Sequence, residues 1–195
     1  MRILAVGLLT CASRRKGSRF FTYHFSFFEA LEIERKFLVV GCGYRDAARA
    51  ADHLVQGYIS TARGRTVRVR IRCGRGYLTI KGPADAEGVS RYEWEKEISP
   101  DDARDLMKLC LPGVIDKTRY LVDCGPHTWE VDEFHGDNEG LVVAEVELER
   151  PDEPYCKPAF VGRELTGDIR FYNSQLTLRP FSAWSDEEKA AILGE

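Results

Sequence analysis

The sequence lacks an excess of positive charge, and this absence narrows the range of partners. Lysine and arginine together number 28, against 31 aspartate and glutamate residues, so the formal net charge is −3. A protein that grips a nucleic-acid backbone needs a surplus of positive potential. We therefore expect no nucleic-acid partner, and any anionic ligand must be bound by basic side chains gathered in one place.

Cysteine and histidine spacings typical of zinc sites are also lacking. The six cysteines are scattered, no C-x-x-C pair occurs, and the sequence has four histidines. Six cysteines could form three disulfides, but a chain of 195 residues can bury a normal core without them. We therefore predict free thiols and a cytoplasmic location.

No apolar run is long enough to cross a bilayer as a helix, so we expect no membrane partner. The run Ile3–Leu9, which follows a single arginine, imitates a signal peptide only weakly. An aromatic-rich stretch without a clear period comes after it. We interpret residues 1–30 as a poorly ordered N-terminal extension and residues 31–195 as one domain.

Segments with a period of two residues dominate that domain, as is typical of β-strands. Short gaps rich in turn-forming residues separate most of them, which favours antiparallel hairpins over parallel crossovers. The sequence therefore predicts an α+β protein dominated by an antiparallel sheet. The predicted strands are Glu32–Val39, Thr66–Arg72, Tyr77–Lys81, Tyr92–Ile98, Lys117–Val122, Thr128–Phe134 and Val143–Glu149.

Helices are fewer. Ser99, followed by a proline and two acids, predicts a helix over Asp101–Leu109. The stretch Ser185–Glu188 has the pattern of a capping box that opens a short C-terminal helix. Two further helices are expected over Asp46–Leu54 and over about Asp168–Leu176.

Charged residues fill one face of nearly every predicted strand, because side chains two positions apart point to the same side. A solvated sheet face explains any single strand. The whole set is different, since like charges repeat along each strand and repel one another unless a ligand gathers them. The sets are Glu32, Glu34 and Lys36; Arg68, Arg70 and Arg72; Tyr77, Thr79 and Lys81; Glu93, Glu95 and Glu97; Lys117 and Arg119; Glu130 and Asp132; Glu145, Glu147 and Glu149.

Closing such a sheet into a barrel with its charged face inward yields a tunnel with basic and acidic sectors. Basic side chains can grip phosphate oxygens. Carboxylates can hold Mg²⁺ or Mn²⁺, which bind the same phosphates. A compact polyphosphate with its divalent metals therefore satisfies both sectors. On the outer face we expect Trp94 and Trp129 to pack under helices.

These residues resemble, in order, the motifs of the CYTH superfamily, the triphosphate tunnel metalloenzymes. Glu32–Lys36 resembles the E-x-E-x-K signature of that family. The resemblance covers about residues 31–180 and implies a closed eight-stranded antiparallel β-barrel with helices packed outside. The other matching segments are Gln56–Tyr58, Arg68–Arg70, Leu78–Gly82, Arg91–Glu95, Lys117–Tyr120, Glu130–Asp132, Gly140–Leu141, Ala144–Glu147, Gly162–Thr166 and Arg170–Asn173, the last two resembling a plug at one end of the tunnel.

The resemblance implies a monomeric or homodimeric hydrolase that cleaves a triphosphate, inorganic tripolyphosphate first of all, with Mg²⁺ or Mn²⁺. Short bacterial inorganic triphosphatases are the most similar members. Lys81 either helps to deprotonate the attacking water, paired with Tyr58, or is one more phosphate ligand. The expected phosphate ligands are Lys36, Arg68, Arg70, Lys117 and Arg119, and the expected metal ligands are Glu32, Glu34, Glu145 and Glu147, supported by Asp132 and Glu130.

Three alternatives stay open at this point. The same superfamily also supports adenylate cyclisation and thiamine triphosphate hydrolysis, which differ in how the organic group is held. A non-catalytic polyphosphate- or nucleotide-binding module would keep the basic side chains and lose the metal-binding carboxylates. A ligand-free structural barrel would not need like charges aligned on one face.

Overall fold

The computed structural model describes residues 31–193, apart from residues 63 and 85–89. The expected extension, residues 1–30, lies outside the described part, as do residues 194–195. Within the strands and the last helix, the side chains of residues 31, 32, 84, 90, 91 and 193 lie outside it as well. No helix in the described part is both long and apolar enough to cross a membrane.

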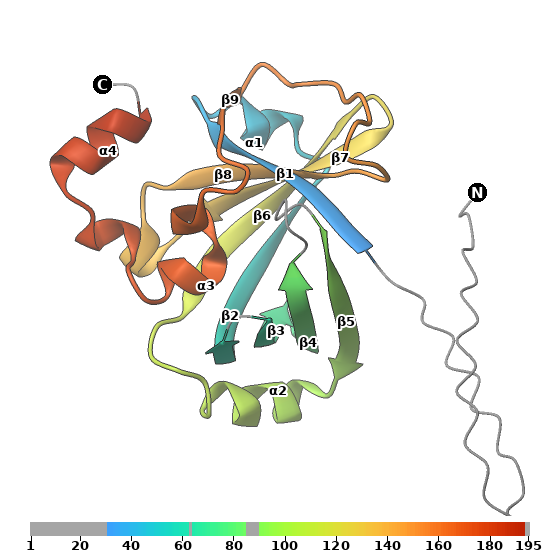
Figure 1. The fold of residues 1–195 in the computed structure, drawn as a ribbon, viewed down its shortest axis with the longest axis vertical. Coiled ribbons are helices and arrows are strands. Elements are labelled where there is room, and N and C mark those ends of the chain that lie inside the picture. The colour runs from blue at the N-terminus through green and yellow to red at the C-terminus, as the bar shows by residue number, and fades with distance from the viewer. Residues whose placement is uncertain (1–30, 63, 85–89, 194–195) are drawn as a thin grey trace, which may run out of the picture.

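An antiparallel sheet forms the body of the molecule (Figure 1), and in the described residues it has nine strands rather than the eight expected. The strands lie in the order β5-β4-β3-β2-β6-β7-β8-β1-β9, and β1 also pairs with β5 through Leu31–Tyr92 and its two neighbouring pairs. The additional strand is β9, which is short and pairs with β1 only in an irregular register. The bounds are β1 Leu31–Val39, β2 Ala50–Ala62, β3 Arg65–Arg72, β4 Arg75–Ala84, β5 Ser90–Ile98, β6 Ile115–Cys124, β7 His127–Phe134, β8 Val142–Glu147 and β9 Val161–Glu164.

The helices pack around the outside of the sheet, with α2 beneath the ends of β2 to β5 and α4 next to the C-terminus (Figure 1). The predicted helix after Ser99 is confirmed as α2, whose Asp102 amide donates to the Ser99 hydroxyl at 3.0 Å. The capping box is confirmed by reciprocal bonds between Ser185 and Glu188 at the start of α4. The helices are α1 Gly43–Ala47, α2 Pro100–Met107, α3 Asn173–Leu176 and α4 Asp186–Leu193, with single turns η1 Gly136–Asn138, η2 Ile169–Phe171 and η3 Phe181–Ala183.

The helix predicted over Asp46–Leu54 is wrong. The chain forms the short helix α1 and then enters the longest strand, β2, at Ala50. Alanine favours helix locally, but β2 is paired on both sides, with β3 and with β6, and this pairing overrides the local preference. The helix expected over Asp168–Leu176 is divided into η2 and α3 by Tyr172, whose ψ of 133° is extended.

Glycine permits α2 to lie directly against the sheet. A Cβ atom placed on Gly76 would stand 2.6 Å from the Ala103 Cβ, and one on Gly57 would stand 2.9 Å from the Met107 Sδ. Neither approach is tolerable for a side chain, so glycine at these two positions sets the depth at which α2 packs. Because Gly57 separates Gln56 from Tyr58, this contact also fixes the strand that presents those two side chains.

The main apolar core lies on the outer side of β1, β6, β7 and β8. Phe37 and Trp129 pack against each other there with ring centroids 5.4 Å apart, and Tyr155 closes over both. Trp129 is therefore buried under residues 149–160, which form no helix, and not under a helix as expected. The expectation is also wrong for Trp94, which is 40% exposed.

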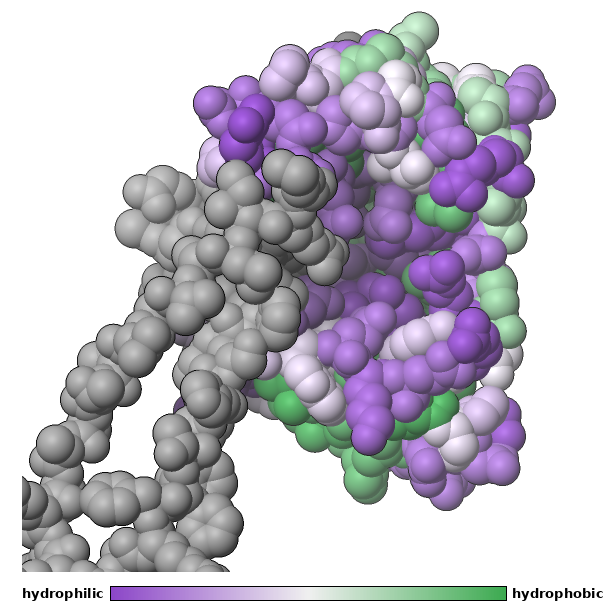
Figure 2. Space-filling view, turned by 90° about the vertical axis from the view of Figure 1, so that its right-hand side faces the viewer, coloured by the Kyte–Doolittle hydropathy of each residue, from purple (hydrophilic) through white to green (hydrophobic). Residues whose placement is uncertain are grey.

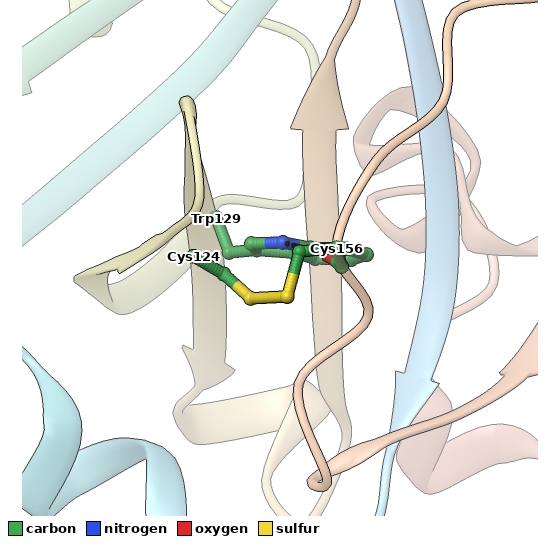
Figure 3. The surroundings of a disulfide bond; sticks show 3 residues. All are labelled: Cys124, Trp129 and Cys156. Atoms are coloured by element: carbon green, nitrogen blue, oxygen red, sulfur yellow. Dashed lines mark hydrogen bonds between the residues drawn. A yellow bond between two sulfur atoms is a disulfide. The ribbon is translucent and has the colours of Figure 1, made fainter.

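The prediction that the cysteines are free thiols is wrong for two of them. Cys124 and Cys156 form a disulfide whose Cα atoms lie 5.7 Å apart, next to Trp129 (Figure 3). The Trp129 indole donates to the backbone oxygen of Cys156 at 3.0 Å. This hydrogen bond and the disulfide hold residues 149–160 against the β6–β7 hairpin. A separation of 32 residues gives no hint of this proximity in the sequence. Cys42, Cys73 and Cys110 are free.

Candidate functional site: a buried network of opposite charges

The charged faces of the strands meet in one chamber, as the alternation predicted. Figure 2 shows a hollow lined by hydrophilic residues on one side of the molecule. Six charged side chains of the expected set are buried although each carries a full charge, and five of them are basic. These are Lys36, Arg68, Lys81, Lys117, Arg119 and Asp132. Burying so many charges is costly unless each is paired or serves a ligand.

Asp132 on β7 organises the two basic residues of β6. Its carboxylate accepts from the Lys117 ammonium and from the Arg119 guanidinium, the latter at 2.7 and 2.6 Å. Burial alone would raise the pKa of Asp132, but Arg119 and Lys117 outweigh burial and lower it. Lys117 is 0% exposed, and burial together with Arg119 lowers the pKa of its ammonium to about 8. Asp132 therefore holds the β6 cations in place.

Glu145 on β8 connects the two neighbouring cations. Its carboxylate lies 2.6 Å from the Lys36 ammonium and accepts from Arg119 at 3.2 Å. Burial opposes the charged form, yet Lys36 and Arg119 hold the pKa of Glu145 well below its ordinary value. For Lys36 burial is likewise outweighed, by Glu145 and Glu34, and its pKa is raised. The Tyr172 ring, 5.6 Å from the Lys36 ammonium, closes this end of the chamber.

Arg68 on β3 is held by the next two strands. Its guanidinium donates to the Thr79 hydroxyl at 3.0 Å and to Glu95 at 3.1 Å, while Thr79 itself donates to Glu95 at 2.6 Å. Burial would raise the pKa of Glu95, but Thr79 and Arg68 lower it. On β4 the Lys81 ammonium lies 2.5 Å from Glu93. Two of the three β5 carboxylates, Glu93 and Glu95, thus contact cations of the chamber.

Arg70 is partly buried and differs from the buried cations. The contact that its side chain makes within the described residues is a bond from Nε to the amide oxygen of Gln56, at 3.1 Å. Burial, together with the charges of Arg68 and Arg119, lowers the pKa of the Arg70 guanidinium to about 9. Gln56 is fully buried and donates its amide to the Tyr58 hydroxyl at 3.1 Å. Arg70 is thus held by the neutral amide of Gln56, whereas Arg68 and Arg119 are held by carboxylates.

Carboxylates face one another across two strand pairs. Glu34 on β1 is directly opposite Glu147 on β8, and Glu145 on β8 is directly opposite Glu130 on β7. Like charges in such positions repel, and a bound cation relieves the repulsion. The described residues contain no group of three or more His, Cys, Asp or Glu side chains arranged to hold a metal ion. The side chain of Glu32, the remaining expected ligand, lies outside the described part.

At least four of the expected metal-site residues lie against cations of the protein itself: Asp132 and Glu130, Glu145, and Glu34, whose carboxylate is 3.8 Å from the Lys36 ammonium. Both Asp132 oxygens accept from Lys117 and Arg119, and Glu130 accepts from Arg119. All donors that could surround a metal here are oxygens, which suits a hard divalent cation. The donor set therefore fits Mg²⁺ or Mn²⁺ best at Glu34 and Glu147, with Glu32 two residues before Glu34 on the same strand face.

The sequence prediction gave no role to four residues that complete the network: Gln56, Thr79, Glu93 and Glu95. The last three were visible as members of the aligned charged or polar faces, so the alternation itself contained the signal. The role of Gln56 could not be recognised because the first part of its strand, β2, has the sequence pattern of a helix. Once β2 is recognised, Gln56 shares a face with Tyr58, and Tyr58 is paired with Arg68 on the neighbouring strand.

Comparison with known proteins agrees with this geometry. The model of the CYTH domain matches residues 30–176. An inorganic triphosphatase of Acetivibrio thermocellus is 44% identical over 156 residues, which cover 80% of this chain and 98% of the relative. An inorganic triphosphatase of Nitrosomonas europaea is 33% identical, with 75% of this chain and 97% of the relative covered. A crystal structure of an inorganic triphosphatase is 31% identical with a TM-score of 0.56, covering 75% of this chain and 94% of that chain.

The match spans far more than half of the chain, and the strands that carry the charged faces all lie inside it. The chain belongs to the CYTH-domain family.

Proposed function

We propose that this protein hydrolyses inorganic triphosphate to phosphate and diphosphate with the help of a divalent metal ion. The observation that carries the proposal is Arg70, a partly buried guanidinium that lies beside Arg68 and Arg119 and rests on the Gln56 amide. Three cations gathered in a low-dielectric chamber favour an anion of high charge density. The names of the two relatives at 44% and 33% identity support inorganic triphosphate as that anion.

The chamber has the shape of a closed tunnel in this proposal. The β1–β5 pairing at Leu31–Ile33 joins β5, at one end of the strand order, to β1, the last strand before β9, which would make an eight-stranded barrel with β9 added outside. Closure removes open sheet edges and excludes bulk water from the interior. Electrostatic attraction between the cations and a polyphosphate is correspondingly stronger there than in water.

The metal site in this proposal consists of carboxylates on β1 and β8. Glu34 and Glu147, which are direct cross-strand neighbours, would hold Mg²⁺ or Mn²⁺ together with Glu32 and Glu145. When bound, the metal would shield the phosphate charge and acidify an attacking water. Asp132 and Glu130 would act indirectly, by orienting Lys117 and Arg119 toward the substrate.

The basic side chains would grip the phosphate oxygens in line along the chamber. Arg68 and Arg119 are held rigidly by carboxylates, so they are preorganised to bind developing charge without reorganising. Lys81, held by Glu93 at 2.5 Å, would bind a phosphate oxygen as an ammonium, or would accept a proton from the attacking water, with Tyr58, after giving up its own proton to become a neutral amine. A loss of kcat at every pH in Lys81→Ala favours the role as proton acceptor, and a pure rise in KM favours the role as phosphate ligand.

The experiment that tests the function is phosphate release from inorganic triphosphate, ATP, thiamine triphosphate and diphosphate, each with Mg²⁺ or Mn²⁺, alongside an assay for cyclic AMP. We expect inorganic triphosphate to be the best substrate. Preferential turnover of ATP to cyclic AMP, or of thiamine triphosphate, would assign one of the other two activities. Absence of turnover with retained triphosphate binding would make the protein a binding module and overturn the proposal.

A further inference from the structure

The outer face of the sheet is covered unevenly. On β7 the outward residue Trp129 is fully buried beneath residues 149–160. On β4 and β5 the outward residues Ile80, Tyr92 and Trp94 are 41%, 42% and 40% exposed. We refer to these three residues as the β4–β5 patch. The outer face of the sheet is therefore buried at Trp129 and partly exposed to solvent at the β4–β5 patch.

The three side chains of the patch are neighbours. Ile80 is paired directly with Trp94 across the two strands. A Cβ atom placed on Gly82, two residues from Ile80, would stand 3.3 Å from the Tyr92 Cβ, so Tyr92 lies over a position without a side chain. The absence of a side chain at Gly82 leaves room above the sheet beside Tyr92. Contiguous exposed apolar side chains are a feature of surfaces that contact other protein segments.

The chain enters the sheet at the edge of this patch. Leu31, the first residue of β1, is paired with Tyr92. The point at which residues 1–30 are attached to the described part of the chain therefore lies next to Tyr92. These residues are unusually rich in aromatic side chains, namely Phe20, Phe21, Tyr23, Phe25, Phe27 and Phe28. The six residue steps from Phe25 to Leu31 can span at most about 20 Å, whereas Trp94 lies about 7 Å beyond Tyr92 along β5.

We propose that the aromatic segment of residues 20–28 docks on the β4–β5 patch of its own chain. The tether at Leu31 gives the segment an effective concentration on the order of millimolar at the patch, which favours it over a second copy of the chain at micromolar concentration. Aromatic side chains bury a large apolar area and pack well against Trp and Tyr rings. Docking would complete the outer layer over β5, the strand whose Glu93 and Glu95 hold Lys81 and Arg68.

Trp94 provides an intrinsic reporter of this contact. The chain has three tryptophans, and the other two, Trp129 and Trp184, are buried. Acrylamide quenching of tryptophan fluorescence in the full-length protein therefore measures access to Trp94. The variant to compare carries Phe25→Ser, Phe27→Ser and Phe28→Ser together. The matched control carries Ile3→Ser, Leu4→Ser and Val6→Ser, which removes apolar side chains far from the point of entry.

In the unmodified protein and in the control we expect Trp94 to be protected. In the triple Phe→Ser variant the quenching constant should rise by about threefold or more, and adding Trp94→Phe should abolish the rise. Unchanged low quenching of Trp129 and Trp184 in that background shows that the fold is intact. Free quenching of Trp94 in the unmodified protein, or equal quenching in all variants, overturns the proposal. Protection that disappears on dilution also overturns it, because a second copy would then be the occupant.

Discussion

Two parts of the chamber handle buried positive charge in opposite ways. On β1 and β6 to β8, each cation contacts a carboxylate, and Asp132 alone serves both Lys117 and Arg119. On β2 and β3, Arg70 rests on the neutral amide of Gln56. In the first arrangement carboxylates balance the charge of the cations without a ligand, and the ion pairs hold the side chains in place. We call this arrangement complete. The second arrangement is incomplete, because a neutral amide does not balance the charge of Arg70. A bound anion is therefore stabilised most at Arg70.

The largest effect is expected where the complete arrangement is broken. Asp132→Asn leaves Lys117, which is 0% exposed, without its carboxylate, so the free energy of unfolding should fall by about 3–5 kcal/mol. Denaturant unfolding measures this. Asp123→Asn is the matched control, because its pair with Arg49 is more than half exposed on both sides and should contribute little to the free energy of unfolding. An equal decrease in the free energy of unfolding in the two variants would contradict the prediction, because the buried ion pair would then contribute no more than the exposed one.

Glu145 joins the paired cations to the proposed metal site. Glu145→Gln keeps the shape but removes the charge that holds Lys36 and Arg119, so kcat for triphosphate should fall on the order of 100-fold. The concentration of Mg²⁺ or Mn²⁺ needed for half-maximal rate should rise as well. Steady-state kinetics over a metal titration measures both. An unchanged rate would remove Glu145 from the metal site.

Gln56→Glu would make the incomplete arrangement resemble the complete one. A carboxylate at this position, about 3.1 Å from the Arg70 Nε, would neutralise the cation and compete with phosphate. We expect the KM for triphosphate to rise about tenfold while the free energy of unfolding does not fall. If the KM stays constant, Arg70 does not contact the substrate. Gln175→Glu, in α3, is a control of the same chemistry.

The smallest effect is expected from pH. Burial lowers the pKa of Lys117 to about 8 and that of Arg70 to about 9 in the protein without ligand. Each group is cationic below its pKa and neutral above it, so kcat/KM, which reports the free enzyme, should fall with rising pH. Between pH 7.5 and 8.5 the loss of protonated Lys117 corresponds to about a threefold decrease. A flat profile over this range would show that these groups keep their protons.

Much of the fold and of the site could be predicted from the period of two residues. The alternation identified the inward face of β3 to β8 correctly, because only a strand places Arg68 and Arg70 on one side. Strand β2 was partly missed, since the alanines before Leu54 favour a helix and only long-range pairing decides otherwise. The disulfide and the bare surface at Trp94 depend on contacts between segments far apart in the chain, for which local patterns carry no information.

The account depends most on Arg70 as the incomplete point of the chamber. The most direct measurement is the Kd of inorganic triphosphate by calorimetry with the divalent metal chelated, for the unmodified protein, Arg70→Met and the control Arg45→Met, whose side chain is half exposed in α1. We predict a Kd about 100-fold higher for Arg70→Met, without a lower Tm, because the cation that is removed is partly buried and rests on a neutral amide. Arg45→Met should leave the Kd unchanged. Equal affinities in all three proteins would contradict the account.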